Sequence, residues 1–124
     1  MEARRKTAVV VEDQPDIREL ERVILEGMGF QVLVRETADG LVDVVRRQRP
    51  DLIVLDLFLP GKSGSEVLAD LARDPIARQV PVVVVSAYPE ELHGLPLAAR
   101  VVVKPFDIEE FETAVRGVVG QDDN

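Results

Sequence analysis

Five short apolar segments alternate along the chain with stretches that have helical spacing. The segments are rich in Val, Ile and Leu, and three of them are apolar at consecutive positions; they comprise Thr7–Val11, Gln31–Arg35, Asp51–Asp56, Val80–Val85 and Arg100–Val103. Consecutive apolar residues are typical of parallel strands covered on both faces, because neither face meets water. We therefore predict five strands of a buried parallel sheet.

Four of the intervening stretches repeat apolar residues at the spacing of an amphipathic helix. The four sets are Ile17, Leu20, Ile24 and Met28; Leu41, Val42 and Val45; Val67, Leu68 and Leu71; and Ile108, Phe111, Val115 and Val118. Pro15 is favoured at the start of the first helix, and Gly29 just past its end. Asp107, three residues before Glu110, indicates an N-cap for the last helix, which Gly120 ends.

The alternation predicts an α/β domain of five strands and five helices, in which right-handed crossovers make the sheet parallel. The chain has 124 residues, the size of one domain, and we find no linker, repeat or low-complexity tract that would divide it. We expect a single domain over residues 1–124, with no effector domain in this chain.

The composition excludes several classes of function. The chain has no Cys, which removes disulfide frameworks, thiolate metal sites and Cys nucleophiles. Its 15 basic and 23 acidic residues give a net charge of −8, which argues against direct nucleic-acid binding. Apolar runs are too short to span a bilayer or to form a signal peptide. We expect a cytoplasmic protein without membrane insertion.

Acidic and polar residues stand where the predicted strands end. Glu12 and Asp13 follow the first strand, Asp56 ends the third, Ser86 follows the fourth, and Lys104 follows the fifth. Ligands of open parallel sheets bind beyond the carboxyl ends of the strands. Three carboxylates at close range repel one another unless a cation joins them, and Mg²⁺ suits carboxylates while leaving room for phosphate oxygens. We predict a Mg²⁺ site beside an anion pocket formed by the lysine and the serine.

Each of these residues taken alone has a simpler interpretation. An acidic residue at a strand end is more often a helix N-cap or a turn former than a ligand. A lone Lys before Pro is usually a surface residue. The occurrence of all five residues at the ends of the predicted strands is much harder to explain in this way, and it favours a functional site.

The sequence resembles the receiver domain of two-component response regulators over essentially its whole length. The resemblance rests on Glu12–Asp13, on Leu55–Asp56 followed by Leu59–Pro60–Gly61 and Gly64, on Ser86–Ala87, and on Lys104–Pro105–Phe106. It implies a flavodoxin-like doubly wound sheet of strand order 2-1-3-4-5. It also implies that the domain accepts a phosphoryl group from a histidine kinase or a histidine phosphotransfer protein, and signals by changing its surface for a protein partner.

The resemblance implies a role for each residue of the site. Asp56 is the implied phosphoacceptor, Lys104 pairs with a phosphoryl oxygen, and the Ser86 hydroxyl closes onto another. The implied Mg²⁺ ligands are the carboxylates of Asp13 and Asp56, the backbone carbonyl of Phe58, and Glu12 through a water molecule. The Lys104–Pro105 peptide is cis in the family. The domain is then a signalling phosphoacceptor that promotes its own phosphorylation and slow dephosphorylation, rather than an enzyme.

Two features depart from the family pattern. Val101 stands three residues before Lys104, where the family usually carries a Tyr or Phe that turns inward on phosphorylation; we interpret Val101 as a core strand residue. Ser86 and Lys104 are only 18 positions apart, about one helical turn fewer than is common in the family. Because prolines and a glycine also interrupt residues 89–96, we expect a short or irregular fourth helix. This region is the family's usual dimerisation face, so the sequence leaves undecided whether the domain forms a homodimer.

Two rival functions fail on single residues. A phosphate-binding loop ending in Gly61–Lys62–Ser63 needs Gly at position 56, which is Asp56. A phosphatase of the haloacid dehalogenase type needs a second Asp at position 58, which is Phe58. The alternative that stays open is a receiver-like interaction or dimerisation module that works without phosphorylation. Val101 and the short fourth helix favour it, and the intact set of acids, serine and lysine argues against it.

Overall fold

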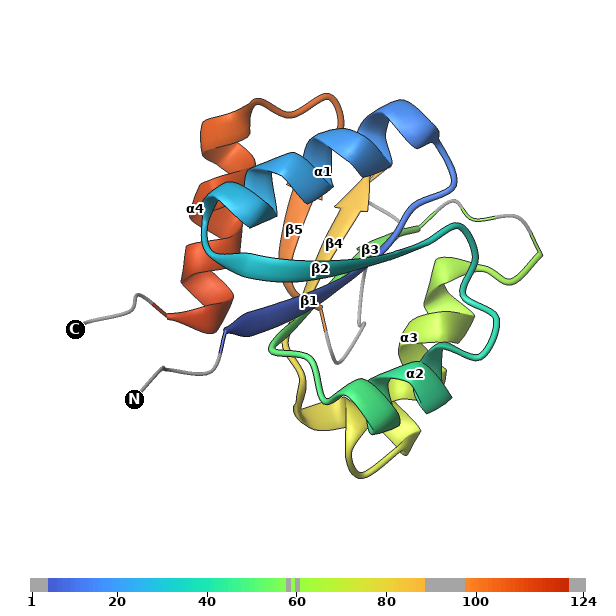
Figure 1. Ribbon diagram of the computed structural model, residues 1–124. Helices are drawn as coiled ribbons and strands as arrows, with labels where there is room; N and C mark the ends of the chain where they lie inside the picture. The colour runs from blue at the N-terminus through green and yellow to red at the C-terminus, as the bar shows by residue number, and fades with distance from the viewer. Residues whose placement is uncertain (1–4, 58, 60, 89–97, 121–124) are drawn as a thin grey trace, which may run out of the picture.

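The computed structural model describes residues 5–57, 59, 61–88 and 98–120. Strands and helices alternate in these residues as far as β4, after which β5 is the next described element (Figure 1). In chain order they are β1 (Lys6–Val11), α1 (Pro15–Gly27), β2 (Phe30–Arg35), α2 (Leu41–Gln48), β3 (Leu52–Asp56), α3 (Gly64–Arg73), a short 3₁₀ helix (Ala77–Gln79), β4 (Val82–Ser86), β5 (Ala98–Val103) and α4 (Ile108–Val119).

The five strands form one parallel sheet in the order β2-β1-β3-β4-β5. Helices α1 and α4 cover one face of the sheet, and α2 and α3 cover the other (Figure 1). This arrangement confirms the predicted flavodoxin-like, doubly wound fold. The strand order reverses direction at the β1–β3 pair, which is where ligand sites form in such sheets.

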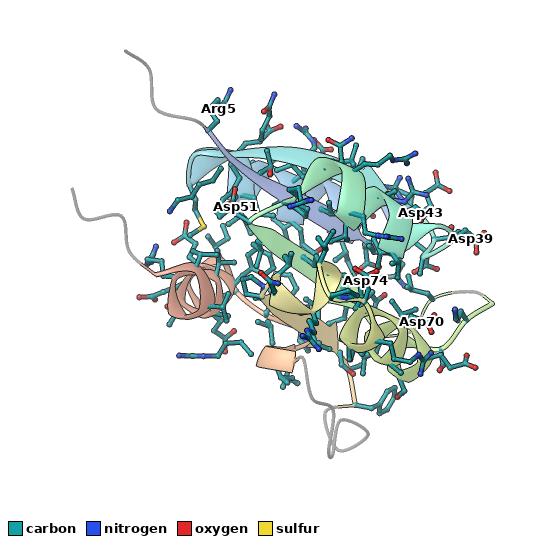
Figure 2. All side chains as sticks on the ribbon, turned by 90° about the horizontal axis from the view of Figure 1, so that it is seen from below. Arg5, Asp39, Asp43, Asp51, Asp70 and Asp74 are labelled. Carbon is teal, nitrogen blue, oxygen red and sulfur yellow. The ribbon has the colours of Figure 1, made fainter. Side chains whose placement is uncertain are left out.

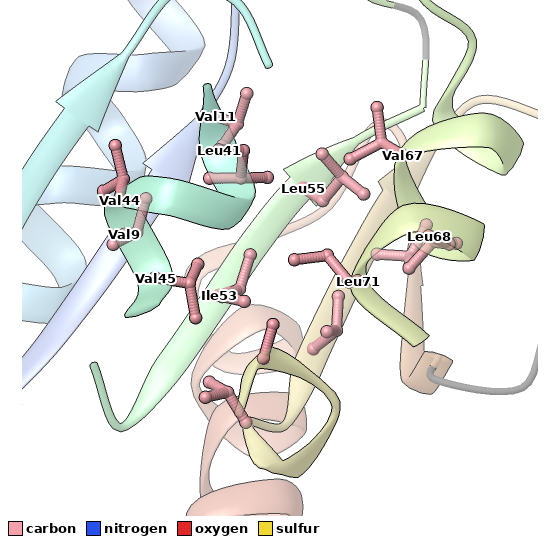
Figure 3. Packing of buried hydrophobic residues seen from close by; sticks show 14 of the residues in the cluster. Val9, Val11, Leu41, Val44, Val45, Ile53, Leu55, Val67, Leu68 and Leu71 are labelled. Carbon is pink, nitrogen blue, oxygen red and sulfur yellow. The ribbon is translucent and has the colours of Figure 1, made fainter. Parts of the chain in front are cut away.

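A separate apolar core fills the space on each face of the sheet. Successive side chains of a strand point to opposite faces, so neighbouring residues of β1 and β3 enter different cores. Val9, Val11, Ile53 and Leu55 pack with the buried side chains of α2 and α3 (Figure 3). On the other face, residues of the same strands pack with Ile24, Leu25, Phe111 and Val115. Coverage on both faces explains why the strands read as consecutive apolar runs.

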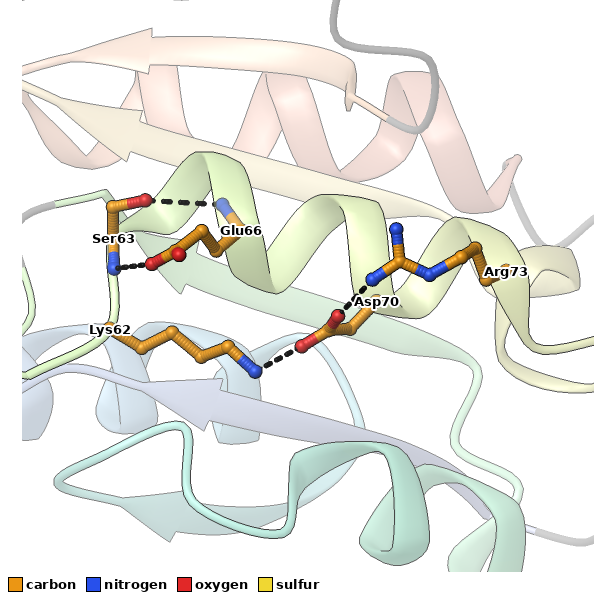
Figure 4. A network of polar contacts seen from close by, with 5 residues as sticks. All are labelled: Lys62, Ser63, Glu66, Asp70 and Arg73. Carbon is orange, nitrogen blue, oxygen red and sulfur yellow. Dashed lines mark hydrogen bonds and ion pairs between the residues drawn. The ribbon is translucent and has the colours of Figure 1, made fainter.

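Local hydrogen bonds define where the helices begin. Pro15 is the first residue of α1, and Asp107 caps α4 by accepting the amide of Glu110 at 2.8 Å, both as predicted. The capping box of α3 is a feature that the sequence analysis did not identify. There the Ser63 hydroxyl accepts the Glu66 amide at 3.2 Å, and the Glu66 carboxylate accepts the Ser63 amide at 3.1 Å (Figure 4). Each pair satisfies amides that a helix start leaves without partners.

Several acidic side chains lie on the side of the molecule formed by α2 and α3. Figure 2 shows four of them there: Asp39, Asp43, Asp70 and Asp74. Asp70 pairs with both Lys62 and Arg73 (Figure 4), and Asp74 lies 3.4 Å from Arg46. These pairs hold the pKa of Asp70 below its usual range, with Lys62 as the main cause. Much of the acidity on this side is therefore neutralised locally by exposed ion pairs, which contribute little to stability.

The structure corrects the sequence analysis at three positions. Ile108 was expected on the buried face of the last helix but is 53% exposed. Leu20 was expected on the buried face of α1 but is 38% exposed, and the neighbouring Glu21 is buried in its place. Val101 was expected in the core, yet it lies 39% exposed on β5, an edge strand of the sheet. The expected fourth helix falls largely on residues 89–97, which lie outside the described residues.

Among the described helices, none has both the length and the apolar character needed to cross a bilayer.

Gly64 begins α3 against the main chain that follows β3. A Cβ atom at Gly64 would lie 2.8 Å from Leu57 Cα and 3.0 Å from its carbonyl oxygen, and backbone atoms cannot turn aside. We therefore expect Gly64→Ala to lower the free energy of unfolding by about 2 kcal/mol in urea denaturation, as overpacking does. Gly27→Ala is the matched control, because no atom lies within 4 Å of its added Cβ. Equal stability of the Gly64→Ala variant and the wild type would contradict the prediction.

Candidate functional site

The predicted site residues lie together at the carboxyl edge of the sheet. Glu12 follows β1 directly, Asp56 is the last residue of β3, Ser86 is the last of β4, and Lys104 follows β5. The strands that carry them are hydrogen-bonded neighbours in the order β1-β3-β4-β5. The parallel sheet therefore brings residues that are up to 92 positions apart in the sequence to one place.

Three carboxylates converge at this edge. Glu12, Asp13 and Asp56 each offer one oxygen atom, and these atoms all lie within 4.8 Å of one another. Glu12 and Asp56 are buried, whereas Asp13 is partly exposed to solvent. A set of carboxylate oxygens with access to water is the kind of donor set that a hard divalent cation such as Mg²⁺ takes. The residues present therefore fit the metal that the sequence predicted.

Lys104 is the cation of the site. Its Nζ lies 3.5 Å from Glu12 Oε1 and 3.4 Å from Asp56 Oδ2, and its side chain is 18% exposed. Its backbone amide donates to the Ser86 carbonyl at 2.9 Å, which places β5 beside β4 up to the edge of the sheet. The Lys104–Pro105 peptide is cis, as the resemblance implied. The ammonium group thus offsets part of the charge of the two buried acids.

Ser86 is fully buried at the end of β4. Its Oγ accepts a hydrogen bond from the Tyr88 amide at 2.9 Å. Because the serine oxygen acts as the acceptor in this bond, its own proton can still be donated to an anion. Phe58, expected to ligate Mg²⁺ through its backbone carbonyl, lies outside the described residues.

Three hydrogen bonds position the Glu12 segment. The Glu12 amide donates to the Arg35 carbonyl at 3.0 Å, and the Arg18 guanidinium donates to the Glu12 carbonyl at 3.1 Å. The Gln14 amide donates to Glu12 Oε2 at 3.2 Å. These bonds hold the side chain of Glu12 at the edge of the sheet, with its second oxygen near Lys104.

Burial makes Glu12 a weak acid. Loss of solvent raises its pKa from 4.5 to about 7, and a hydrogen bond with Asp56 and the charge of Asp56 act in the same direction. The Gln14 amide and the charge of Lys104 oppose the rise. Without a cation, the cluster therefore retains a proton near neutral pH. A divalent cation bound nearby would favour loss of that proton, because its positive charge stabilises the ionised carboxylate.

Glu21 is a buried acid that the sequence analysis missed. It is 1% exposed on the inner side of α1, and its pKa is raised to about 8 by burial and, next, by the charge of Glu12. Spacing could have identified it, since positions 17, 21, 24 and 28 follow one helical face as well as the predicted positions 17, 20, 24 and 28 do. The sequence analysis assigned Leu20 to the buried face instead, because Leu is apolar and Glu is charged.

Comparisons with known proteins agree with this geometry. The model of the response regulator receiver domain family matches residues 8–116. The phosphate regulon transcriptional regulatory protein PhoB of Escherichia coli is 37% identical over 115 residues, which make up 90% of this chain and 50% of PhoB. The chain thus spans about half the length of the curated relatives it matches.

Two solved structures share both the fold and detectable sequence identity. The activated receiver domain of Klebsiella pneumoniae RstA, described with BeF₃, superposes with a TM-score of 0.80 at 27% identity, covering 94% of this chain and 100% of that one. Thermotoga maritima TrrA, solved in complex with Mg²⁺ and BeF, has a TM-score of 0.80 at 28% identity, covering 91% of this chain and 98% of that one.

A doubly wound five-stranded sheet with clustered acids and a lysine at its carboxyl edge defines a phosphorelay signalling domain. The chain belongs to the receiver domain family of two-component response regulators. Membership places the acid cluster in a signalling domain, and Asp56 is the buried acid at the carboxyl end of the central strand, β3.

The raised pKa of Glu21 makes stability depend on pH. Between about pH 4.5 and 8 the folded state keeps a proton that the unfolded state has lost, so stability falls as the pH rises through this range. Glu21→Gln removes this contribution. Between pH 5 and pH 9, we expect the free energy of unfolding of the wild type to fall by on the order of 2 to 5 kcal/mol more than that of the variant, measured by urea denaturation. Parallel pH profiles for the two proteins would refute a raised pKa at Glu21.

Proposed function

We propose that this domain accepts a phosphoryl group on Asp56, from a phosphorylated histidine of a kinase or phosphotransfer protein, with Mg²⁺ bound at the adjacent acids. The observation that carries the proposal is the position of the Asp56 carboxylate. It is buried at the end of β3, and its Oδ2 lies 3.4 Å from the Lys104 Nζ. One of its oxygen atoms also lies within 4.8 Å of a carboxylate oxygen of Glu12 and one of Asp13. A nucleophile, a cation and a metal-binding set thus meet at one place.

The reaction is an in-line displacement at phosphorus. An Asp56 oxygen forms the new P–O bond while the P–N bond to the donor histidine breaks, and the imidazole nitrogen takes the electron pair. Such transfers depend mainly on positioning and on neutralising charge. Lys104 pairs with a phosphoryl oxygen, and the Ser86 hydroxyl donates its proton to another. The domain promotes its own phosphorylation and its slow dephosphorylation, and it is a signalling phosphoacceptor rather than a turnover enzyme.

The metal is proposed to be held by Asp13 and Asp56 directly, by Glu12 through water, and by the backbone carbonyl of Phe58. When bound, Mg²⁺ supplies positive charge to the phosphoryl oxygens. The TrrA structure was solved with Mg²⁺ and BeF, which supports the same occupancy here. No organic cofactor is needed.

The partners follow from the class of the domain. The phosphodonor is a histidine kinase or a histidine phosphotransfer protein, and the output is the recognition of the domain's surface by another protein. PhoB is a transcriptional regulator, but this chain aligns with only half of it, and its net charge of −8 disfavours contact with nucleic acid by this domain. We propose that residues 1–124 form one receiver domain that works in the cytoplasm.

One observation favours a second candidate. Val101 lies half-exposed on β5 and has no ring that could change its packing on phosphorylation. This favours a receiver-like interaction module that works without phosphate. The buried Asp56 beside Lys104 favours the phosphoacceptor, because an interaction module needs neither group.

The phosphoacceptor is tested with a small phosphodonor. Wild-type protein incubated with phosphoramidate and Mg²⁺ should gain one phosphoryl group in intact-mass spectrometry, and hydroxylamine should remove it, as it does from acyl phosphates. Asp56→Asn should gain none. Asp43→Asn, at an exposed aspartate of α2, is the matched control and should be labelled like the wild type. An unmodified wild type at saturating donor and Mg²⁺ would exclude the phosphoacceptor and leave the interaction module.

The metal site is tested by thermal unfolding. A ligand that binds only the folded state raises its stability, so millimolar Mg²⁺ should raise the Tm of the wild type by at least about 3 °C. The effect should disappear in Asp13→Asn, which keeps the shape of the site but removes one ligand charge. The exposed Asp16→Asn, on the first turn of α1, should respond like the wild type. A Tm that is indifferent to Mg²⁺ would contradict a metal site.

A further inference from the structure

Glu21 is a carboxyl group without a hydrogen-bond partner in an apolar layer. It lies on the inner side of α1 with Ile24 and Leu25, which belong to the core between α1, α4 and the sheet. Both of its carboxyl oxygens are buried, and neither has a hydrogen-bond partner among the described residues. Ionising such a group is costly, because neither water nor a donor solvates the charge. The neutral, protonated acid is the form that this environment favours.

The charges that reach Glu21 come from the phosphoacceptor site. Glu12 and Asp56 raise its pKa, and Lys104 lowers it. Glu21 therefore responds to the groups that a metal ion or a phosphoryl group would contact directly. The expected Mg²⁺ ligands and Lys104 act on this carboxyl group through space, since no hydrogen bond or ion pair joins them to it in the described residues.

Other charged groups around α1 point elsewhere. Helix α1 packs against β1, β2 and α4, and the buried residues of α4 are apolar. Arg35, at the end of β2, donates to the Asp39 carbonyl, and Arg18 of α1 donates to the Glu12 carbonyl. Arg116 of α4 pairs with Glu112 of its own helix. The acids and the lysine of the phosphoacceptor site thus remain as the charges that act on Glu21 within the described chain.

We propose that Glu21 is a proton-binding residue of the phosphoacceptor site: it holds a proton while the acid cluster is free of metal and releases it to solvent when Mg²⁺ binds there. The proton leaves the Glu21 carboxyl group as the two positive charges of the ion enter, so the net charge of the buried region changes less than the ion alone would change it. A negatively charged phosphoryl group on Asp56 acts in the opposite direction and favours return of the proton.

Linkage makes this coupling reciprocal. If Mg²⁺ promotes loss of the Glu21 proton, loss of that proton raises the affinity for Mg²⁺ by the same factor. Any proton that Glu12 exchanges for the metal is still exchanged in a protein that lacks Glu21. The contribution of Glu21 is therefore the difference in pH dependence between the wild type and a variant with a neutral residue at position 21.

The experiment compares Mg²⁺ binding in the wild type and Glu21→Gln by calorimetry from pH 6 to pH 9. The amide is neutral at every pH and resembles the protonated acid. We expect equal affinities at pH 6 and about fivefold tighter binding by the wild type at pH 9, the lower end of typical coupling. The wild type should also release more protons on binding at pH 8, measured in two buffers of different ionisation enthalpy.

Two further variants keep the result interpretable. Glu21→Leu replaces the acid with an apolar residue of similar size and should reproduce the flatter pH profile. Glu26→Gln removes an exposed charge from the same helix and should behave like the wild type. Mg²⁺ binding with the same pH dependence in the wild type and in the Glu21 variants would overturn the proposal.

The inference rests on the proposed metal site, and the two can fail separately. Failure of the metal site appears as no Mg²⁺ binding by the wild type or by any variant, which would also end this proposal. Failure of the Glu21 proposal alone appears as normal binding and normal phosphorylation of Asp56 with unchanged proton release in Glu21→Gln.

Discussion

Burial of the sheet on both faces determines what its carboxyl edge can do. The strands carry apolar side chains into two cores, and the polar groups that remain are those at the strand ends. Charges there lie against a layer that excludes water, so each acts on its neighbours more strongly than it would in solution. The 3.4 Å approach of Lys104 to Asp56 and the weak acidity of Glu12 both follow from this constraint.

The same burial makes the clustered acids at the carboxyl edge costly for the stability of the fold. Lys104 pairs with two of the three carboxylates at the edge, and a fourth acid, Glu21, is buried on the inner side of α1. A domain selected only for stability would place apolar residues at several of these positions, since uncompensated buried charge is costly. The acids form a cluster whose oxygen atoms lie close enough together to hold a metal ion. If the proposed Mg²⁺ binds there, relief of the repulsion among these acids contributes to the free energy of binding.

The strands and the residues that meet at the carboxyl edge could be predicted from local sequence information, whereas the sheet order came from the resemblance to the receiver family. Consecutive apolar residues indicate a strand that is buried on both faces of the sheet. Asp56 ends one such apolar run, and Lys104 directly follows another. The errors arose where a pattern fits two arrangements. Leu20 and Glu21 occupy adjacent positions that both satisfy helical spacing, and only packing against the sheet decides which one is buried. Val101 has the character of a core residue, but strand β5 lies at an edge, where one side of an apolar residue stays open.

The close approach of Gly64 to Leu57 makes the two sides of the phosphoacceptor site different: main-chain contacts form one side, and side-chain groups form the other. On the β3 side, α3 begins in main-chain contact with the segment after Asp56, and the Gly64 amide donates to the Leu57 carbonyl at 3.2 Å. On the β4 and β5 side, the groups that reach the site are the Ser86 hydroxyl and the Lys104 ammonium, which turn about single bonds. In the proposed phosphoryl transfer, the backbone thus positions Asp56, while the groups that meet the added charge are rotatable side chains. Under the proposed function, a signal that leaves this site would therefore start at the Ser86 and Lys104 side chains rather than at the main chain after β3.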